Sequence, residues 1–398
     1  MNPLMTRIIL LLLIISFLPV HNTVVYAART PQSTVVIRVR ATPSATFEQK
    51  IVLNPKDAVQ LLQASKEEEA SYPAALTDIY LLISRNAQVR TFRMEKLGVF
   101  WSETELKRLV LSPKASTQLQ KYCADLKERH YGIRIPWSEA KQLLPRKSTF
   151  SIIDLEKGLS FRVQRRAGSK HADVQPLTQA DTKIMKQIYN NQWSWKRKAI
   201  LVVTDKHKFA ASMNGMPHGG DGIPGNGFSG HFCVHFLDSS THRSANPDIF
   251  HQLMVYTASG QRETFFNLAS PAMLSEIFIG ALSVRDDDLL RSVSIGLNPE
   301  AVNSFLKELE RGTTFRLTNK NKRNYSTRST EQDIVQSLTA EVTQTVSWRR
   351  KNQPEKSTAF QFECTRDSLH SPWKITNVRS VLYKNMDMTT GSSMSADD

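Results

Sequence analysis

The chain has 398 residues, 40% of them hydrophobic, which is enough for ordinary hydrophobic cores in two or three domains. Its formal net charge of +15 favours an anionic partner such as a cell-wall polymer or a membrane surface. The sequence contains no zinc-finger spacing, RNP-type aromatic motif or recognition-helix pattern, so we exclude nucleic acid as the partner. The charge is diffuse, and a solvated basic surface without a specific ligand stays open as an alternative.

Residues 1–27 have the organisation of a secretory signal peptide. Arg7 ends a short positive region, an apolar run covers 8–20, and small residues precede a cleavage position after Ala27. The run is shorter than the roughly 20 apolar residues that cross a membrane, so we expect no stable transmembrane anchor. We therefore predict a secreted or cell-wall-associated protein of a Gram-positive envelope, with a retained signal anchor as the alternative.

The chain has three cysteines, Cys123, Cys233 and Cys364. An odd number cannot pair completely within one exported chain, so at least one thiol stays reduced or pairs with another molecule. Cys233 is the candidate for this thiol, because Cys123 and Cys364 fit the role of small buried hydrophobic residues better.

Residues 30–135 predict a small α+β module without a recognisable site. Asn54 and Pro55 supply an N-cap and a first-turn proline for a helix. Further patterns predict strands and one helix that is interrupted near Pro113. The expected strands cover 34–40, 78–85 and 89–101, and the expected helix covers 103–129.

The next part of the chain predicts a mainly β domain with one inserted helix. Thr178 is the expected N-cap of that helix, and a glycine-rich segment at 219–230 is expected to be a loop or lid. Strands are expected from the alternation of apolar residues. They cover 149–154, 159–165, 199–204, 209–213 and 230–237.

Residues 262–385 predict a third, α+β domain. Ser270-Pro271 and Asn298-Pro299 each begin an amphipathic helix, and strand-like runs follow. This order of elements, with a Trp-Lys-Ile-Thr strand at the end, resembles the cone-shaped NTF2-like fold. The polar tail at 386–398 is expected to be disordered. The four strand-like runs cover 314–317, 334–348, 358–364 and 373–382.

The motifs that carry chemistry lie between 213 and 242. A His-Gly pair at His218 precedes the glycine-rich segment, and His231, Cys233 and His235 follow it at alternating positions. In a strand, alternating residues point to one face, so these three side chains should line one surface. A thiol among imidazoles, with glycines that allow close backbone approach, indicates an activated nucleophile.

These motifs resemble the YkuD-type L,D-transpeptidase domain, over roughly 146–257. The family pattern is a His-Gly pair, a loop, and a Ser-His-Gly-Cys-hydrophobic-Arg motif. His218, His231 and Cys233 match it. Phe232 stands in place of the glycine, and His235 in place of the arginine. The resemblance implies a multidomain α+β protein with a mainly β YkuD-like central domain, flanked by the small α+β module and the NTF2-like domain.

The resemblance also implies roles for individual residues. Cys233 would attack a carbonyl in a peptidoglycan stem peptide, with His218 as the base and His231 positioning the motif. The acyl-enzyme would pass to an amine or to water without a cofactor. Substrate contacts would come from the residues that flank the motif, and two of them could replace the lost arginine in binding a carboxylate. These residues are Ser229, Gly230, His235 and Arg243.

Two alternatives stay open. Histidine and aspartate cluster in this region, and zinc takes three or four such ligands, so a zinc-dependent cell-wall peptidase is one of them. The other is a non-catalytic, wall-associated binding protein. A working thiol enzyme should have a partly exposed Cys233 within hydrogen-bond reach of His218, and a decayed one should bury it. The zinc ligands would be His171, Asp173, His231 and His235.

Overall fold

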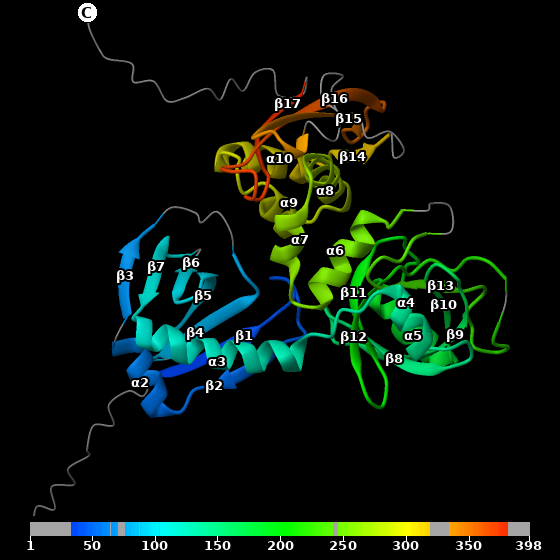
Figure 1. Ribbon diagram of the computed structural model, residues 1–398, viewed down its shortest axis with the longest axis horizontal. Helices are drawn as coiled ribbons and strands as arrows, with labels where there is room; N and C mark the ends of the chain where they lie inside the picture. Colours follow the sequence, from blue (N-terminus) through cyan, green and yellow to red (C-terminus); the bar gives the residue numbers. More distant parts are fainter. Residues whose placement is uncertain are drawn as a thin grey trace, which may run out of the picture.

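The computed structural model has a mixed α+β fold. Figure 1 shows three lobes that follow one another along the chain, each built on its own sheet. The predicted signal peptide and the predicted disordered tail lie outside the described residues. Within the residues that the structure does describe, no helix is both long and apolar enough to span a bilayer. The described residues are 33–63, 65–70, 76–86, 88–102, 104–220, 222–241, 246–318 and 334–380.

The first lobe packs two helices against an antiparallel seven-stranded sheet in the order β2-β1-β4-β5-β6-β7-β3. The predicted strand at 34–40 and the helix after Asn54 are confirmed. The elements are β1 (Thr34–Val39), β2 (Gln49–Val52), α2 (Pro55–Gln63), β3 (Ser65–Glu69), β4 (Ile79–Arg85), β5 (Gln88–Lys96), β6 (Val99–Ser102), β7 (Lys107–Leu111) and α3 (Pro113–His130).

Two predictions for this lobe are wrong in detail. Within the predicted helix at 103–129, residues 107–111 form strand β7, in which Leu109 and Leu111 alternate into the core, and the helix begins only at Pro113. β7 pairs with β6 and β3, and this long-range pairing overrides the local helical pattern. The predicted strand at 89–101 is a hairpin, because the chain turns at Gly98 with φ of 79°.

The second lobe is a closed barrel of six strands in the order β10-β13-β12-β11-β8-β9. The hairpin of β8 and β9 and the helix α5 are confirmed, and Thr178 caps α5 through a capping box with Asp181. Strand β10 was not predicted. The elements are α4 (Trp137–Leu143), β8 (Thr149–Asp154), β9 (Ser160–Ala167), β10 (Ala172–Pro176), α5 (Gln179–Ile188), β11 (Lys198–Val203), β12 (Lys208–Met213), β13 (Phe232–His235) and α6 (Ile249–Ala258).

The third lobe packs helices against an antiparallel four-stranded sheet in the order β14-β15-β16-β17. Ser270 and Asn298 cap α8 and α10 as predicted, with a proline in the first turn of each helix. The strand predicted from residue 334 begins only at Thr339. The elements are α7 (Arg262–Leu268), α8 (Pro271–Val284), α9 (Asp287–Val293), α10 (Pro299–Glu310), β14 (Thr314–Leu317), β15 (Thr339–Arg349), β16 (Lys356–Thr365) and β17 (Lys374–Ser380).

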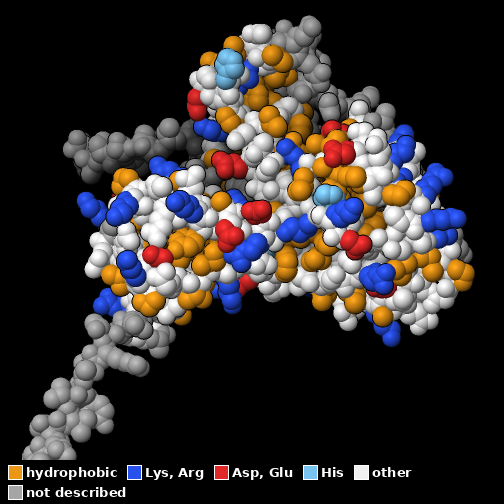
Figure 2. Space-filling view, turned by 60° about the horizontal axis from the view of Figure 1, so that its bottom comes forward, with side chains coloured by type: hydrophobic (Ala, Val, Ile, Leu, Met, Phe, Trp, Pro, Cys, Tyr) orange, Lys and Arg blue, Asp and Glu red, His pale blue; other side chains and the backbone are white. Residues whose placement is uncertain are grey.

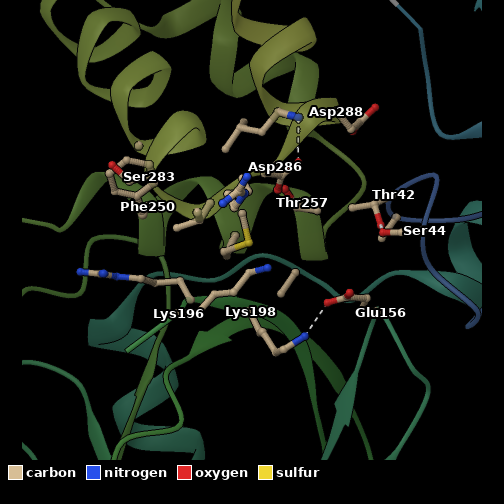
Figure 3. Close-up of a pocket in the computed structure, with 18 of the residues that line it drawn as sticks. Thr42, Ser44, Glu156, Lys196, Lys198, Phe250, Thr257, Ser283, Asp286 and Asp288 are labelled. Carbon is tan, nitrogen blue, oxygen red and sulfur yellow. Dashed lines mark hydrogen bonds and ion pairs between the residues drawn. The ribbon is translucent and has the colours of Figure 1, made fainter. Parts of the chain in front are cut away.

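A cavity of about 590 Å³ lies where the three lobes meet. Figure 3 shows Lys196 and Lys198 on the barrel side of it and Asp286 on the side of the third lobe, with Thr42 from the first lobe. Cys233 does not line this cavity. The candidate site described below is therefore separate from the space between the lobes.

An ion cluster beside the cavity ties the first lobe to the third. Arg93 on β5 and Arg262 on α7 both donate to the carboxylate of Asp288 on α9, at 3.0 and 2.6 Å. Burial opposes the ionisation of Asp288, yet the two guanidinium groups hold the pKa of its carboxyl below the usual value. The ionised carboxylate thus stays bound by both arginines.

Basic side chains are spread over the molecule. On the face in Figure 2, lysine and arginine side chains are scattered across the lobes, with aspartate and glutamate among them. The net charge of +15 is therefore not gathered into one patch on this face.

His130 makes the stability of the first lobe depend on pH. Its side chain is fully buried and stacks on Phe47, and neither ring nitrogen has a hydrogen-bond partner among the described residues. Burial lowers its pKa from 6.5 to about 4. Between these values the unfolded chain binds a proton that the folded chain does not, so stability is lost as the pH falls below 6.5.

We predict that His130→Phe keeps the stacked ring and removes this pH dependence. From pH 6.5 down to about 4, the free energy of unfolding of the wild type should fall relative to the variant by about 1.4 kcal/mol per pH unit. Urea unfolding of both proteins at several pH values measures the difference. If the free energy of unfolding changed with pH equally in both proteins, the prediction would be contradicted.

Candidate active site

Strand β13 places Cys233 on the outer face of the barrel. Phe232 and Val234 point into the barrel core, so Cys233 and His235 point to the opposite face. The register sets Asp173 of β10 opposite Cys233. Residues that face each other in antiparallel strands share one side of the sheet, and the Asp173 and Cys233 side chains are therefore neighbours.

The His-Gly pair reaches Cys233 through a backbone bridge. His218 and His231 exchange two backbone hydrogen bonds, of 2.9 and 2.7 Å. The bridge requires glycine on both sides. Gly219 and Gly230 have φ of 75° and 88°. A Cβ atom at Gly219 would meet the His231 ring, and one at Gly230 would meet the His218 carbonyl.

This bridge brings His218 Nε2 to 3.3 Å from Cys233 Sγ. His218 Nδ1 lies 2.8 Å from the carbonyl oxygen of Met216. A carbonyl oxygen only accepts, so Nδ1 carries the proton and donates it to Met216. In the neutral ring, Nε2 then has its lone pair directed at the thiol. His218 is thus held in the tautomer that a general base requires.

The thiol itself is buried and protonated. Cys233 is 4% exposed, and burial raises its pKa to about 12, with a further contribution from the charge of Asp173. A hydrogen bond from the Asn214 side chain opposes this shift. A working thiol enzyme was expected to have Cys233 within hydrogen-bond distance of His218 and partly exposed. The structure shows the first feature but not the second. Access to Sγ therefore requires neighbouring side chains to move.

A row of buried imidazoles continues from Cys233. His235 lies between His171 and His251, with ring centroids 4.5 and 3.7 Å apart. His251 comes from α6, which packs against the outer face of β11–β13, and its Nδ1 lies 2.8 Å from the Ser212 hydroxyl. Burial lowers the pKa of His235 and of His251 well below the usual value, so both rings are neutral.

The loop before β13 is anchored by side chains of the barrel. Gln175 accepts from the backbone of Ile223 at 2.8 Å and donates to the carbonyl of Gly230. Asn226 donates to Pro176 at 2.8 Å, and Thr182 donates to the carbonyl of Asn226 at 2.7 Å. These contacts fix the loop over β10 and α5, and with it the position of Gly230 beside His218.

One aromatic side chain covers the base. Trp195 is 52% exposed and its ring lies 5.1 Å from that of His218, at an interplanar angle of 40°. Trp193, by contrast, is half-buried and packs edge-on against Phe228. Trp195 therefore offers an exposed apolar surface next to His218.

The structure brings most of the predicted site residues together. Cys233, His218 and His231 meet at the bridge, next to Gly230. Asp173 lies on the neighbouring strand β10, His171 lies directly before that strand, and His235 lies on β13 itself. Arg243 lies outside the described residues, and Ser229 is exposed beside Gly230.

Three neighbours of the site were missed from the sequence. They are the buried His251, which stacks on His235, Asn214, whose side chain bonds to Cys233, and Trp195, whose ring lies near that of His218. Asn214 lies four residues before His218 in the sequence, and this proximity to the His-Gly pair is the local signal that could have indicated its contact with Cys233.

The comparisons with known proteins give no family. No family model matches this chain, and no curated protein sequence matches it. The function is therefore inferred from the geometry of the site.

We predict that alkylation of Cys233 by iodoacetamide accelerates about tenfold per pH unit between pH 8 and 11, because the thiolate is the reactive form and its pKa lies near 12. An unstructured cysteine peptide should level off near its pKa of about 8.5. Mass spectrometry of the peptide that contains Cys233 follows the reaction. A rate already constant at pH 7 would instead mean a preformed thiolate–imidazolium pair with His218.

Proposed function

We propose that this protein is an exported cell-wall enzyme, a cysteine-dependent L,D-transpeptidase or L,D-carboxypeptidase that acts on peptidoglycan stem peptides. The observation that carries the proposal is the contact of 3.3 Å between Cys233 Sγ and His218 Nε2. It joins the two motifs that resemble the YkuD-type domain. A closed barrel that holds both motifs is consistent with that domain, and helices on a four-stranded antiparallel sheet are consistent with an NTF2-like domain.

The reaction proceeds in two transfers of the acyl group. His218 Nε2 takes the thiol proton as Sγ attacks the carbonyl carbon of the stem peptide. The C–N bond then breaks, and His218 returns the proton to the leaving amine, so a thioester remains on Cys233. An acceptor amine attacks this thioester in transpeptidation, and water attacks it in carboxypeptidation. The thiol is restored in both cases.

Because the pKa of Cys233 is high, His218 has to remove the thiol proton during the attack. A thiol with a pKa of about 12 is almost entirely protonated at neutral pH, so proton removal has to accompany the attack. The Asn214 hydrogen bond stabilises the thiolate that forms. We assign the exposed face of Trp195, together with Ser229 and Gly230, to contact with the peptide that enters the site.

A zinc peptidase is the second candidate, favoured by a cluster of His171, Cys233 and His235 whose ligand atoms lie within 4.8 Å of one another. Hydrolytic zinc keeps an open coordination position for water. All three residues of the cluster are buried, and Cys233 also contacts the base. The thiol mechanism therefore accounts for more of the site.

We predict that a carbapenem forms a covalent adduct with the wild type and none with Cys233→Ala. Intact-mass spectrometry detects the adduct. His218→Asn keeps a donor near the position of Nδ1 and removes the base, so adduct formation should slow by roughly 10²–10⁴-fold. Cys364→Ala removes another buried thiol and should react like the wild type.

A folded wild type that forms no adduct, and releases no amino acid from a stem tetrapeptide, would favour the non-catalytic, wall-associated protein. Thermal unfolding of each variant checks that it is folded. Adduct formation that is unchanged in His218→Asn would remove His218 from the mechanism.

A further inference from the structure

Cys233 has a second set of neighbours that the acyl transfer does not use. One ring nitrogen each of His171 and His235 lies with Cys233 Sγ in a group whose members are all within 4.8 Å of one another. Two neutral imidazoles and a thiolate are a common ligand set of Zn²⁺. The next two observations indicate that this group is arranged for a cation.

The first observation is the orientation of His171. Its Nδ1 lies 2.8 Å from the carbonyl oxygen of Ser240, which can only accept, so Nδ1 carries a proton. Its Nε2 lies 3.1 Å from the Asp173 carboxylate. In the neutral ring, a lone pair would face an anionic oxygen, and the contact becomes favourable when Nε2 carries a proton or binds a metal ion. Histidine ligands of metals typically donate their second nitrogen to a backbone carbonyl in this way.

The second observation is His235 Nδ1. His235 is 1% exposed, and this nitrogen has no hydrogen-bond partner among the described residues. Buried polar atoms are nearly always paired, and an exception calls for an explanation such as an ion. The ring is stacked between His171 and His251, so its orientation is fixed.

We propose that His171, Cys233 and His235 bind Zn²⁺, with the Asp173 carboxylate as the fourth ligand, and that the bound metal switches the thiol off. Binding forms a Zn–S bond and releases the thiol proton to solvent. The electron pair of sulfur that would attack the substrate is then held by the metal, so acyl transfer stops. This regulation rests on the proposed function, since it acts on the same thiol.

The residues fit this ion in charge and in dimension. One thiolate and one carboxylate balance the two positive charges, so the loaded site is neutral, which favours binding in a buried place. Zn–N bonds of about 2.0 Å and Zn–S bonds of about 2.3 Å place tetrahedral ligand atoms roughly 3.5 Å apart. On binding, the spacing of at most 4.8 Å between the ligand atoms would shorten to this value.

The test measures metal binding and thiol reactivity separately. Zn²⁺ is titrated into the metal-free full-length protein against a chromophoric chelator, and Co²⁺ is added to a second sample to detect a thiolate-to-metal charge-transfer band. Carbapenem adduct formation is then timed with and without one equivalent of Zn²⁺. His171→Asn keeps a donor for the Ser240 carbonyl and removes Nε2. His207→Asn changes an exposed histidine elsewhere and is the matched control.

We expect one Zn²⁺ per chain, a charge-transfer band, and adduct formation at least about tenfold slower with Zn²⁺ and restored by EDTA. His171→Asn should lose affinity by at least about tenfold and form the adduct at the same rate with or without Zn²⁺. Absence of Zn²⁺ binding, or equal affinity in His171→Asn, overturns the inference even if the adduct forms. Binding of Zn²⁺ without any adduct in the metal-free protein supports the metal site and instead refutes the thiol enzyme.

Discussion

The site depends on the pairing of one short strand. The four residues of β13 pair with β10 on one side and β12 on the other, and this pairing both closes the barrel and sets which face Cys233 occupies. A shift of one residue would turn Cys233 into the barrel core and Val234 outward. The burial of Phe232 and Val234 in that core opposes such a shift. The hydrophobic effect in the barrel thus fixes the position of the nucleophile.

The two partners in the site differ in burial. Burial raises the pKa of Cys233, which lowers the resting fraction of thiolate. His218 is only partly buried and is held in place by the Met216 carbonyl and by the backbone bridge to His231. In the proposed mechanism, a well-positioned base therefore acts on a poorly ionised thiol, and proton transfer accompanies the attack.

The sequence predicted those parts of the fold that depend on interactions between residues close together in the chain. The caps at Thr178, Ser270 and Asn298 start helices because each satisfies backbone donors of its own first turn. The alternation of His231, Cys233 and His235 predicted a shared face, although only the last two lie within β13. No local pattern predicts strand β7 or the contact of His251 with His235. Both depend on packing between segments that are far apart in the sequence. Asp173 was named as a possible zinc ligand, but its place opposite Cys233 follows only from the pairing of β10 with β13.

His235 stands where the pattern that these motifs resemble has an arginine, and the burial of this position explains why histidine fits it. A charged side chain would be costly at a position that is 1% exposed and stacked between two imidazoles. A neutral histidine avoids this cost and places nitrogen atoms beside the thiol. In the two proposals, Cys233 lies between a base and a set of metal ligands. Its sulfur can attack a carbonyl or bind Zn²⁺, but it cannot do both at once, because both use the same electron pair.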